Sequence, residues 1–221
     1  MLQHLIRQDA DLRMVPTDRD GLTAAVARLR EELSTGPEAE RTRVLTRWIG
    51  IARMSLGDHG EARTFLRRSL ELAVAGGNVR AVVATELNFG DAHRYAGDVE
   101  TAETFYRSAL DTARGGCPEL LDFALQHFGK HLMERGDLVG ARARLQEALR
   151  LRIAKGNTEL VGSTQVALDR VDVLIGGTGT AEAGTAVFTR LGFRDRERRV
   201  LTDRLVPGRS GGGEEGFEGL G

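Results

Sequence analysis

The amino-acid sequence predicts an all-α protein, an α-solenoid of stacked antiparallel helix pairs, and three observations predict it. A fourteen-residue pattern that opens with Gly-Asp occurs at Gly57, Gly97 and Gly136, at steps of 40 and 39 residues. The segments on both sides of each Gly-Asp follow helical periodicity, and glycine-rich joints separate one copy from the next. Self-similarity at such a period is typical of repeat architectures.

The three copies match at fixed distances from the Gly-Asp. A glycine stands seven residues before it, an alanine five after it, a large apolar residue nine after it, and a small residue followed by leucine at twelve and thirteen. We take as the repeat signature Gly50, Gly57, Ala62, Leu70, Gly90, Gly97, Ala102, Ala109, Leu110, Gly129, Gly136, Ala141, Ala148 and Leu149. Each repeat is therefore predicted to be one helix, a Gly-Asp turn and a second helix.

The glycine in the middle of each first helix indicates close packing within the pair. Glycine in a helix interior costs about 1 kcal/mol relative to alanine, so its recurrence at Gly50, Gly90 and Gly129 needs a reason. Without a Cβ atom the partner helix can approach closely. The alanine five residues after the Gly-Asp is the expected neighbour.

The flanks are predicted to extend the array in degraded form. Residues 21–33 carry an apolar stripe, and residues 159–175 repeat the first-helix pattern. We expect nine or ten helices between about residues 2 and 205, with essentially no strand. The predicted divisions are an N-terminal helical cap (1–36), three repeats (37–77, 78–117 and 118–157), a degenerate fourth repeat with a C-terminal capping helix (158–205), and a disordered tail (206–221).

Composition indicates a soluble protein. The 221 residues have a net charge of −1 and a single cysteine, Cys117, so the chain has no internal disulfide and fits a reducing compartment. No apolar run approaches the roughly 20 residues of a spanning helix, and the N-terminus lacks the apolar stretch of a signal peptide. The sequence predicts a cytoplasmic location and no membrane partner.

No set of residues predicts catalysis. His127, His131 and Glu134 are spaced to share one helical face, which leaves a metal site open as an alternative to ordinary polar positions. The glycine-rich run at 176–184 lacks the lysine of a phosphate-binding loop. The arginines at 194–204 alternate with carboxylates, as on a solvated capping helix. We therefore expect no enzyme activity, no metal, no cofactor and no direct nucleic-acid binding.

The first helix with its central glycine, the Gly-Asp turn, and the following Ala, large apolar residue and Ala-Leu resemble the tetratricopeptide repeat. The resemblance covers residues 41–154, and the step of about 40 residues exceeds the family's usual 34. This longer form is similar to arrays in bacterial transcriptional and signalling regulators. It implies a right-handed superhelix whose concave face, formed by the first helices, binds peptides or partner helices.

The resemblance implies a protein-interaction module, a bacterial scaffold or regulator that binds a peptide or protein in its concave groove. The alternative is a regulatory subunit that senses a small ligand or signal peptide, and homodimerisation stays open. Carried over by their distance from each Gly-Asp, the predicted groove residues are Arg47, Trp48, Ile51, Asn88, Asp91, Arg94, Tyr95, Gln126, His127, Lys130 and Glu134. Arg94 and Lys130 are expected to hold a carboxylate, so that reversing both charges removes binding without changing stability.

Overall fold

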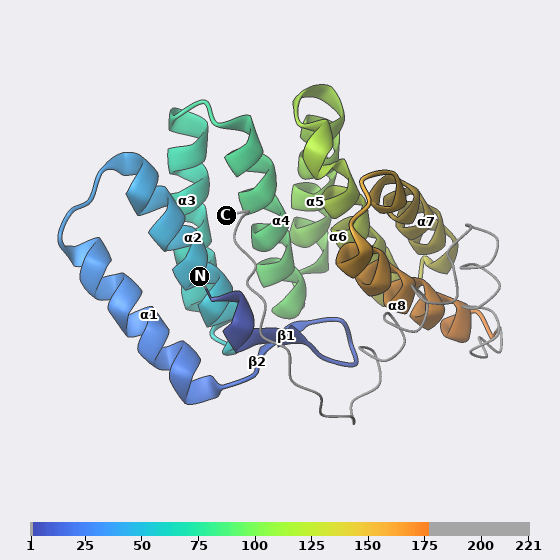
Figure 1. The fold of residues 1–221 in the computed structure, drawn as a ribbon, viewed down its shortest axis with the longest axis horizontal. Coiled ribbons are helices and arrows are strands. Elements are labelled where there is room, and N and C mark those ends of the chain that lie inside the picture. Colours follow the sequence, from blue (N-terminus) through green and yellow to red (C-terminus); the bar gives the residue numbers. More distant parts are fainter. Residues whose placement is uncertain (1, 177–221) are drawn as a thin grey trace.

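The structure, a computed structural model, describes residues 2–176. Within that range eight α-helices pack side by side in chain order (Figure 1), which confirms the predicted all-α solenoid. They are α1 (Arg19–Ser34), α2 (Ala39–Ser55), α3 (His59–Ala75), α4 (Val79–Tyr95), α5 (Val99–Gly116), α6 (Leu121–Glu134), α7 (Leu138–Ala154) and α8 (Thr158–Leu174). The predicted C-terminal capping helix and tail lie outside the described residues.

Each Gly-Asp closes one helix and opens the next. Gly57, Gly97 and Gly136 have φ between 80° and 88°, the left-handed conformation that glycine adopts at low cost after a helix end. The aspartate that follows is the N-cap of the next helix, and its carboxylate accepts a hydrogen bond from a backbone N–H of the first turn; Asp98, for example, accepts from the Thr101 amide. The repeated dipeptide is therefore a stop signal and a start signal in direct succession.

The core of each pair is built on the glycine of its first helix. A Cβ atom at Gly50 would lie 2.6 Å from Leu66 Cγ, one at Gly90 would lie 2.7 Å from the Tyr106 ring, and one at Gly129 would lie 2.8 Å from Leu145 Cγ. The close neighbour is thus the large apolar residue nine after the Gly-Asp. The expected alanine contributes only its backbone carbonyl, in the first and third pairs.

The N-terminal segment differs from the expectation of a chain without strands. A short 3-10 helix (Gln3–Leu5) leads into β1 (Ile6–Gln8) and β2 (Met14–Pro16), which pair antiparallel with Ile6 opposite Pro16. We call residues 6–16 the hairpin. Its two strands pair only with each other within the described residues, and in Figure 1 it lies across the lower ends of α2 and α4 and reaches toward α8.

The first helices form the inner face of the array. Contacts link α2 to α4, α4 to α6 and α6 to α8, so consecutive first helices touch directly. We call the side formed by α2, α4, α6 and α8 the inner face. All eleven predicted groove residues belong to three of its helices.

Candidate functional site on the inner face

Most of the predicted groove side chains are buried in contacts between first helices. Arg47, Trp48, Tyr95 and His127 are partly exposed, and Glu134 is exposed. The six buried members are Ile51, Asn88, Asp91, Arg94, Gln126 and Lys130. As binding residues all six remain a prediction, while Asn88, Asp91, Arg94 and Gln126 make side-chain contacts to a neighbouring first helix.

The joint between α4 and α6 contains a buried charge network centred on Asp91. The Tyr106 hydroxyl donates to Asp91 Oδ1 at 2.7 Å, and Arg94 Nη2 donates to the same atom at 3.1 Å. His127 Nδ1 on α6 lies 2.9 Å from Asp91 Oδ2. Burial alone would raise the pKa of Asp91, but His127 and Arg94 hold it well below its ordinary value.

Arg94 also connects the two helices directly. Its Nη1 donates to Glu134 Oε1 at 2.6 Å, while its Nε donates to the Tyr106 hydroxyl at 3.1 Å. The guanidinium is therefore engaged by Asp91, Tyr106 and Glu134 together. An arginine held in this way has few donors left for a partner's carboxylate, which weakens its predicted role as a carboxylate ligand.

Lys130 lies beside this network without a partner of its own. Its side chain is only 3% exposed, and among the described residues its ammonium group has no hydrogen bond or ion pair. Burial, reinforced by the positive charges of Arg94 and Arg152, lowers the pKa of Lys130 to about 7.

The other two joints use different residues. Between α2 and α4, Arg47 Nε donates to Asn88 Oδ1 at 2.9 Å. Burial and the neighbouring Arg43 and Arg80 lower the pKa of Arg47 to about 10. Arg47 also lies over the Trp48 ring, at 5.9 Å from the ring to the guanidinium carbon.

Between α6 and α8 the central residue is Arg152 of α7, which was not among the predicted site residues. It is 1% exposed, and it donates from Nε to Asp122 at 2.8 Å and from Nη1 to the Thr164 hydroxyl at 2.7 Å. It also contacts the predicted groove residue Gln126. The sequence around Arg152 does not indicate that its side chain is buried, because arginines on helices are usually exposed.

The hairpin covers the rim of the inner face, where the first helices end. The backbone N–H of Met14 donates to the Tyr95 hydroxyl at 2.7 Å. Arg13 stacks over the Tyr95 ring, 5.2 Å from its centre, and its Nη2 lies 3.2 Å from Glu134 Oε2. On the far side of the turn, Asp11 lies 3.7 Å from Arg170 of α8. The helical cap predicted over residues 1–36 did not include this hairpin or its contacts.

The turn of the hairpin has an unusual backbone at Leu12. Asp9 organises the turn, because its Oδ1 accepts hydrogen bonds from the amides of Asp11 and Arg13, each at 2.9 Å. Leu12 has φ of 60°, the only positive φ among described non-glycine residues. A left-handed residue with a Cβ costs about 1–2 kcal/mol. The side chain is 3% exposed and belongs to the main hydrophobic cluster, which contributes about 1.5–3 kcal/mol for a leucine.

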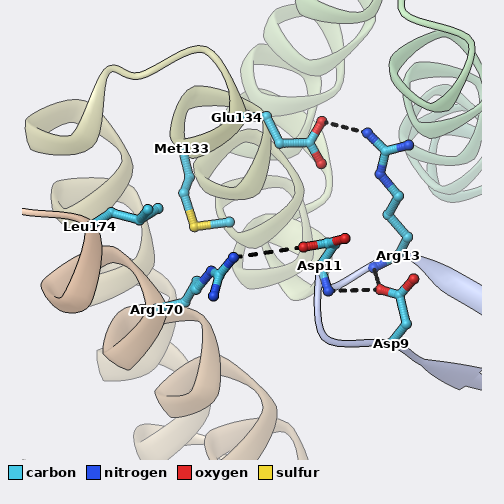
Figure 2. Close-up of a pocket in the computed structure, with 7 residues that line it drawn as sticks. All are labelled: Asp9, Asp11, Arg13, Met133, Glu134, Arg170 and Leu174. Atoms are coloured by element: carbon cyan, nitrogen blue, oxygen red, sulfur yellow. Dashed lines mark hydrogen bonds and ion pairs between the residues drawn. The ribbon is translucent and has the colours of Figure 1, made fainter.

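A cavity of about 580 Å³ lies between the hairpin turn and helices α6 and α8. Figure 2 shows Arg13 and Glu134 facing each other on one side of it and Asp11 and Arg170 on the other. Its lining is completed by Asp9, Met133 and Leu174. The cavity is open and carries both signs of charge, so it suits a polar or zwitterionic group better than an apolar ligand.

The possible metal ligands do not converge. His127 faces Asp91, His131 lies 3.6 Å from Glu103, and Glu134 pairs with Arg94 and Arg13. In the part of the chain that the structure describes, no group of three or more His, Cys, Asp or Glu side chains is arranged to hold a metal ion. None of the described helices combines the length and apolar character needed to cross a membrane.

These features define a helical repeat protein whose inner face carries a polypeptide segment. A family model described as tetratricopeptide repeat matches residues 41–115, which contain the first two helix pairs. Over this segment the resemblance to the tetratricopeptide repeat inferred from the sequence is confirmed. Tetratricopeptide repeats generally mediate protein–protein interaction and are typically non-catalytic.

Solved structures extend the likeness beyond the matched segment. The crystal structure of BtubC (BKLC) from P. vanneervenii has a TM-score of 0.64 at 18% identity, covering 96% of this chain and 85% of that chain. A putative kinesin light chain from Podosopora anserina, with nearly identical tetratricopeptide-like repeats, has a TM-score of 0.59 at 14% identity, covering 83% and 89%. At these identities the likeness concerns the fold. The search of curated proteins returned no match.

Proposed function

We propose that this protein is a protein-interaction module that binds a peptide or protein segment along its inner face, as a cytoplasmic scaffold or regulator in a bacterium. The observation that carries the proposal is the hairpin. A chain segment already lies on the inner face, held by a backbone hydrogen bond to Tyr95 and an ion pair to Glu134. Tetratricopeptide repeats recognise polypeptides on such surfaces, and the partly exposed Arg47, Trp48 and His127 extend the available surface.

The cavity beside the hairpin turn supports a second candidate function. Its volume of about 580 Å³ and its mixed charges fit a small polar ligand or the charged end of a short signal peptide. In that case the protein is a ligand-sensing regulatory subunit, and Arg170 and Asp11 are among the residues that a ligand contacts. Neither candidate requires catalysis.

Site-specific crosslinking tests the binding face. A photoreactive amino acid at Arg47 or His127 reports on the inner face, while the same group at Glu71 of α3 or Asp111 of α5, both exposed, reports on the second helices. We expect a discrete crosslinked protein from the inner positions and none from the outer ones. Crosslinks only from α3 and α5 would contradict the proposal, and co-purification of a metabolite without any protein would favour the sensor.

A further inference from the structure

The hairpin contacts the rim of the inner face as a bound peptide would. Leu12 places an apolar side chain in the main hydrophobic cluster, Arg13 meets the Tyr95 ring and Glu134, and the amide of Met14 donates to the Tyr95 hydroxyl. The Met14 side chain packs against a second apolar cluster that includes Phe89. Three consecutive hairpin residues thus contact three different features of the rim. Leu12 occupies an apolar site, Arg13 an acidic and aromatic site, and the Met14 amide meets a hydrogen-bond acceptor.

We propose that the rim formed by the ends of α4 and α6 together with α8 is a peptide-binding subsite, filled in this structure by residues 11–14 of the chain itself. The partner that replaces them is a protein segment with an apolar residue followed directly by arginine and a second apolar residue. This inference rests on the proposed function, since it names the kind of segment that the inner face accepts.

The chemistry of the rim selects this sequence. Glu134 and the face of the Tyr95 ring both favour a cation, and a guanidinium can pair with one while stacking on the other. The Tyr95 hydroxyl accepts from the backbone, so it fixes the register of the segment without selecting its side chain. Arg94 already pairs with Glu134 and lies over the Tyr95 ring, so the arginine of the segment is the second guanidinium at this site.

The contacts that hold the hairpin are of a kind that a competitor can replace. The Arg13 and Glu134 side chains are 38% and 26% exposed, and the Asp11–Arg170 pair is more exposed still, so both pairs are weakened by solvent. The hairpin adds no strand to a larger sheet within the described residues. Leu12 reaches its site with a left-handed backbone, and this strain weakens the hold of the hairpin on the rim.

The turn also leaves the subsite incompletely filled. The cavity of about 580 Å³ begins directly beside Asp9, Asp11 and Arg13 and continues to α8 (Figure 2). A longer segment that follows the path of Asp11 to Met14 has room to continue past the point where the hairpin must turn back. The hairpin is therefore a minimal occupant of a larger binding surface.

Competition between the hairpin and a peptide added in trans tests the proposal. The probe is a fluorescein-labelled peptide with the sequence of residues 5–17, and the readout is fluorescence anisotropy on the full-length chain. Two variants release the hairpin, Leu12→Asp by removing the apolar anchor and Arg13→Glu by repelling Glu134. Because apparent affinity falls with the fraction of open sites, we expect both variants to bind the probe at least about tenfold more tightly than the parent.

Three controls make the result specific. Arg7→Ala changes an exposed hairpin residue whose side chain donates a hydrogen bond to the neighbouring Gln8 carbonyl, so the affinity of this variant for the probe should equal that of the parent. Probes carrying Leu12→Asp or Arg13→Glu should lose binding to the opened variants. Hydrogen exchange of the Met14 amide should become faster in both opened variants while the amides of α5 stay protected.

The inference is overturned if the probe binds parent and opened variants equally, or binds none of them at millimolar concentration. Equal binding would show that the probe and the hairpin do not share a site, and absence of binding would make the hairpin a fixed structural cap. Should Leu12→Asp reduce helical content, the affinities of the parent and of Arg13→Glu for the probe still test whether the hairpin competes with the peptide. A partner that crosslinks to the inner face with the same yield in parent and opened variants would leave the proposed function intact and remove only this subsite.

Discussion

The interface within a helix pair and the joint between two pairs are built on opposite principles. Within each pair the contact is apolar and recurs three times: a glycine of the first helix faces a large side chain of the second, as Gly90 faces Tyr106. Between pairs, apolar contacts are joined by polar contacts that differ each time, from one hydrogen bond at Asn88 to a charge network at Asp91 and a buried guanidinium at Arg152.

The contacts within a pair therefore determine how each helix pair folds, and the contacts between pairs determine how one pair packs on the next. The recurring apolar contact makes every pair the same building unit, so its residues recur in the sequence at fixed offsets. The polar joints set how one unit sits on the next, and each depends on hydrogen bonds that only one pairing satisfies. Substitutions in the two kinds of interface should therefore fail in different ways.

The largest expected effect is at the second joint. Arg94→Glu places a carboxylate beside Asp91 and Glu134 and leaves the buried Asp91 without its guanidinium, so we expect a loss of about 3–5 kcal/mol in the free energy of unfolding. Urea denaturation followed by circular dichroism measures it. This corrects the expectation that reversing the charges of Arg94 and Lys130 leaves stability unchanged, because both side chains are buried. An unchanged denaturation midpoint would show that the network contributes nothing to the joint.

The next effect is within the pairs. Gly90→Leu and Gly129→Leu force a side chain into space occupied by Tyr106 and Leu145, and we expect each to cost about 2–3 kcal/mol through overpacking. Gly115→Leu is the matched control, since a Cβ at that exposed helical glycine meets nothing within 4 Å. Its melting temperature should equal or slightly exceed that of the parent. Equal melting temperatures for all three variants would rule out the close approach of the helices.

The smallest effect is a gain of stability at Lys130. Its folded pKa of about 7 lies below the ordinary value of 10.5, so between these pH values the unfolded chain binds a proton that the folded chain has released. The stability of the parent should therefore rise with pH across this window. Lys130→Met removes the buried amine, and we expect it to be about 1–2 kcal/mol more stable at pH 7, with the advantage shrinking toward pH 10. A difference independent of pH would show that Lys130 does not titrate in this range.

The sequence predicted the helix pairs because their determinants are local and repeated. Gly97 and Asp98 act through their own backbone and the first turn of the next helix, so their effect can be read without knowing the rest of the fold. The neighbour of the central glycine was misjudged by one helical turn, since the crossing of two helices depends on side-chain size as well as on spacing.

The hairpin could not be predicted in this way. Its strands have three residues each, too few for an alternating pattern, and the left-handed position of its turn holds Leu12 in place of the glycine or asparagine that would have indicated a turn. What stabilises it is contact with Tyr95 and Glu134, which lie about 80 and 120 residues further along the chain. Local propensity carries no information about such contacts.

The predicted groove residues lie on the inner-face helices, yet six of the eleven are buried there. Whether a polar residue such as Asn88 or Gln126 faces solvent depends on how closely consecutive first helices approach. That distance is set by the joints themselves. Offsets from the Gly-Asp could therefore select the face of the helix but not the exposure of each residue.

The unequal joints also fix the order of the repeats. Glu134 pairs with Arg94, and His127 lies beside Asp91. In the preceding repeat, the positions at the same distances before the Gly-Asp hold Tyr95 and Asn88. A gene duplication of residues 78–117 would thus set Arg94 against a tyrosine and Asp91 against an amide. A new repeat can join this array only together with a matching change in its neighbour. The polar contacts between first helices therefore constrain the number of repeats, even though each unit folds in the same way.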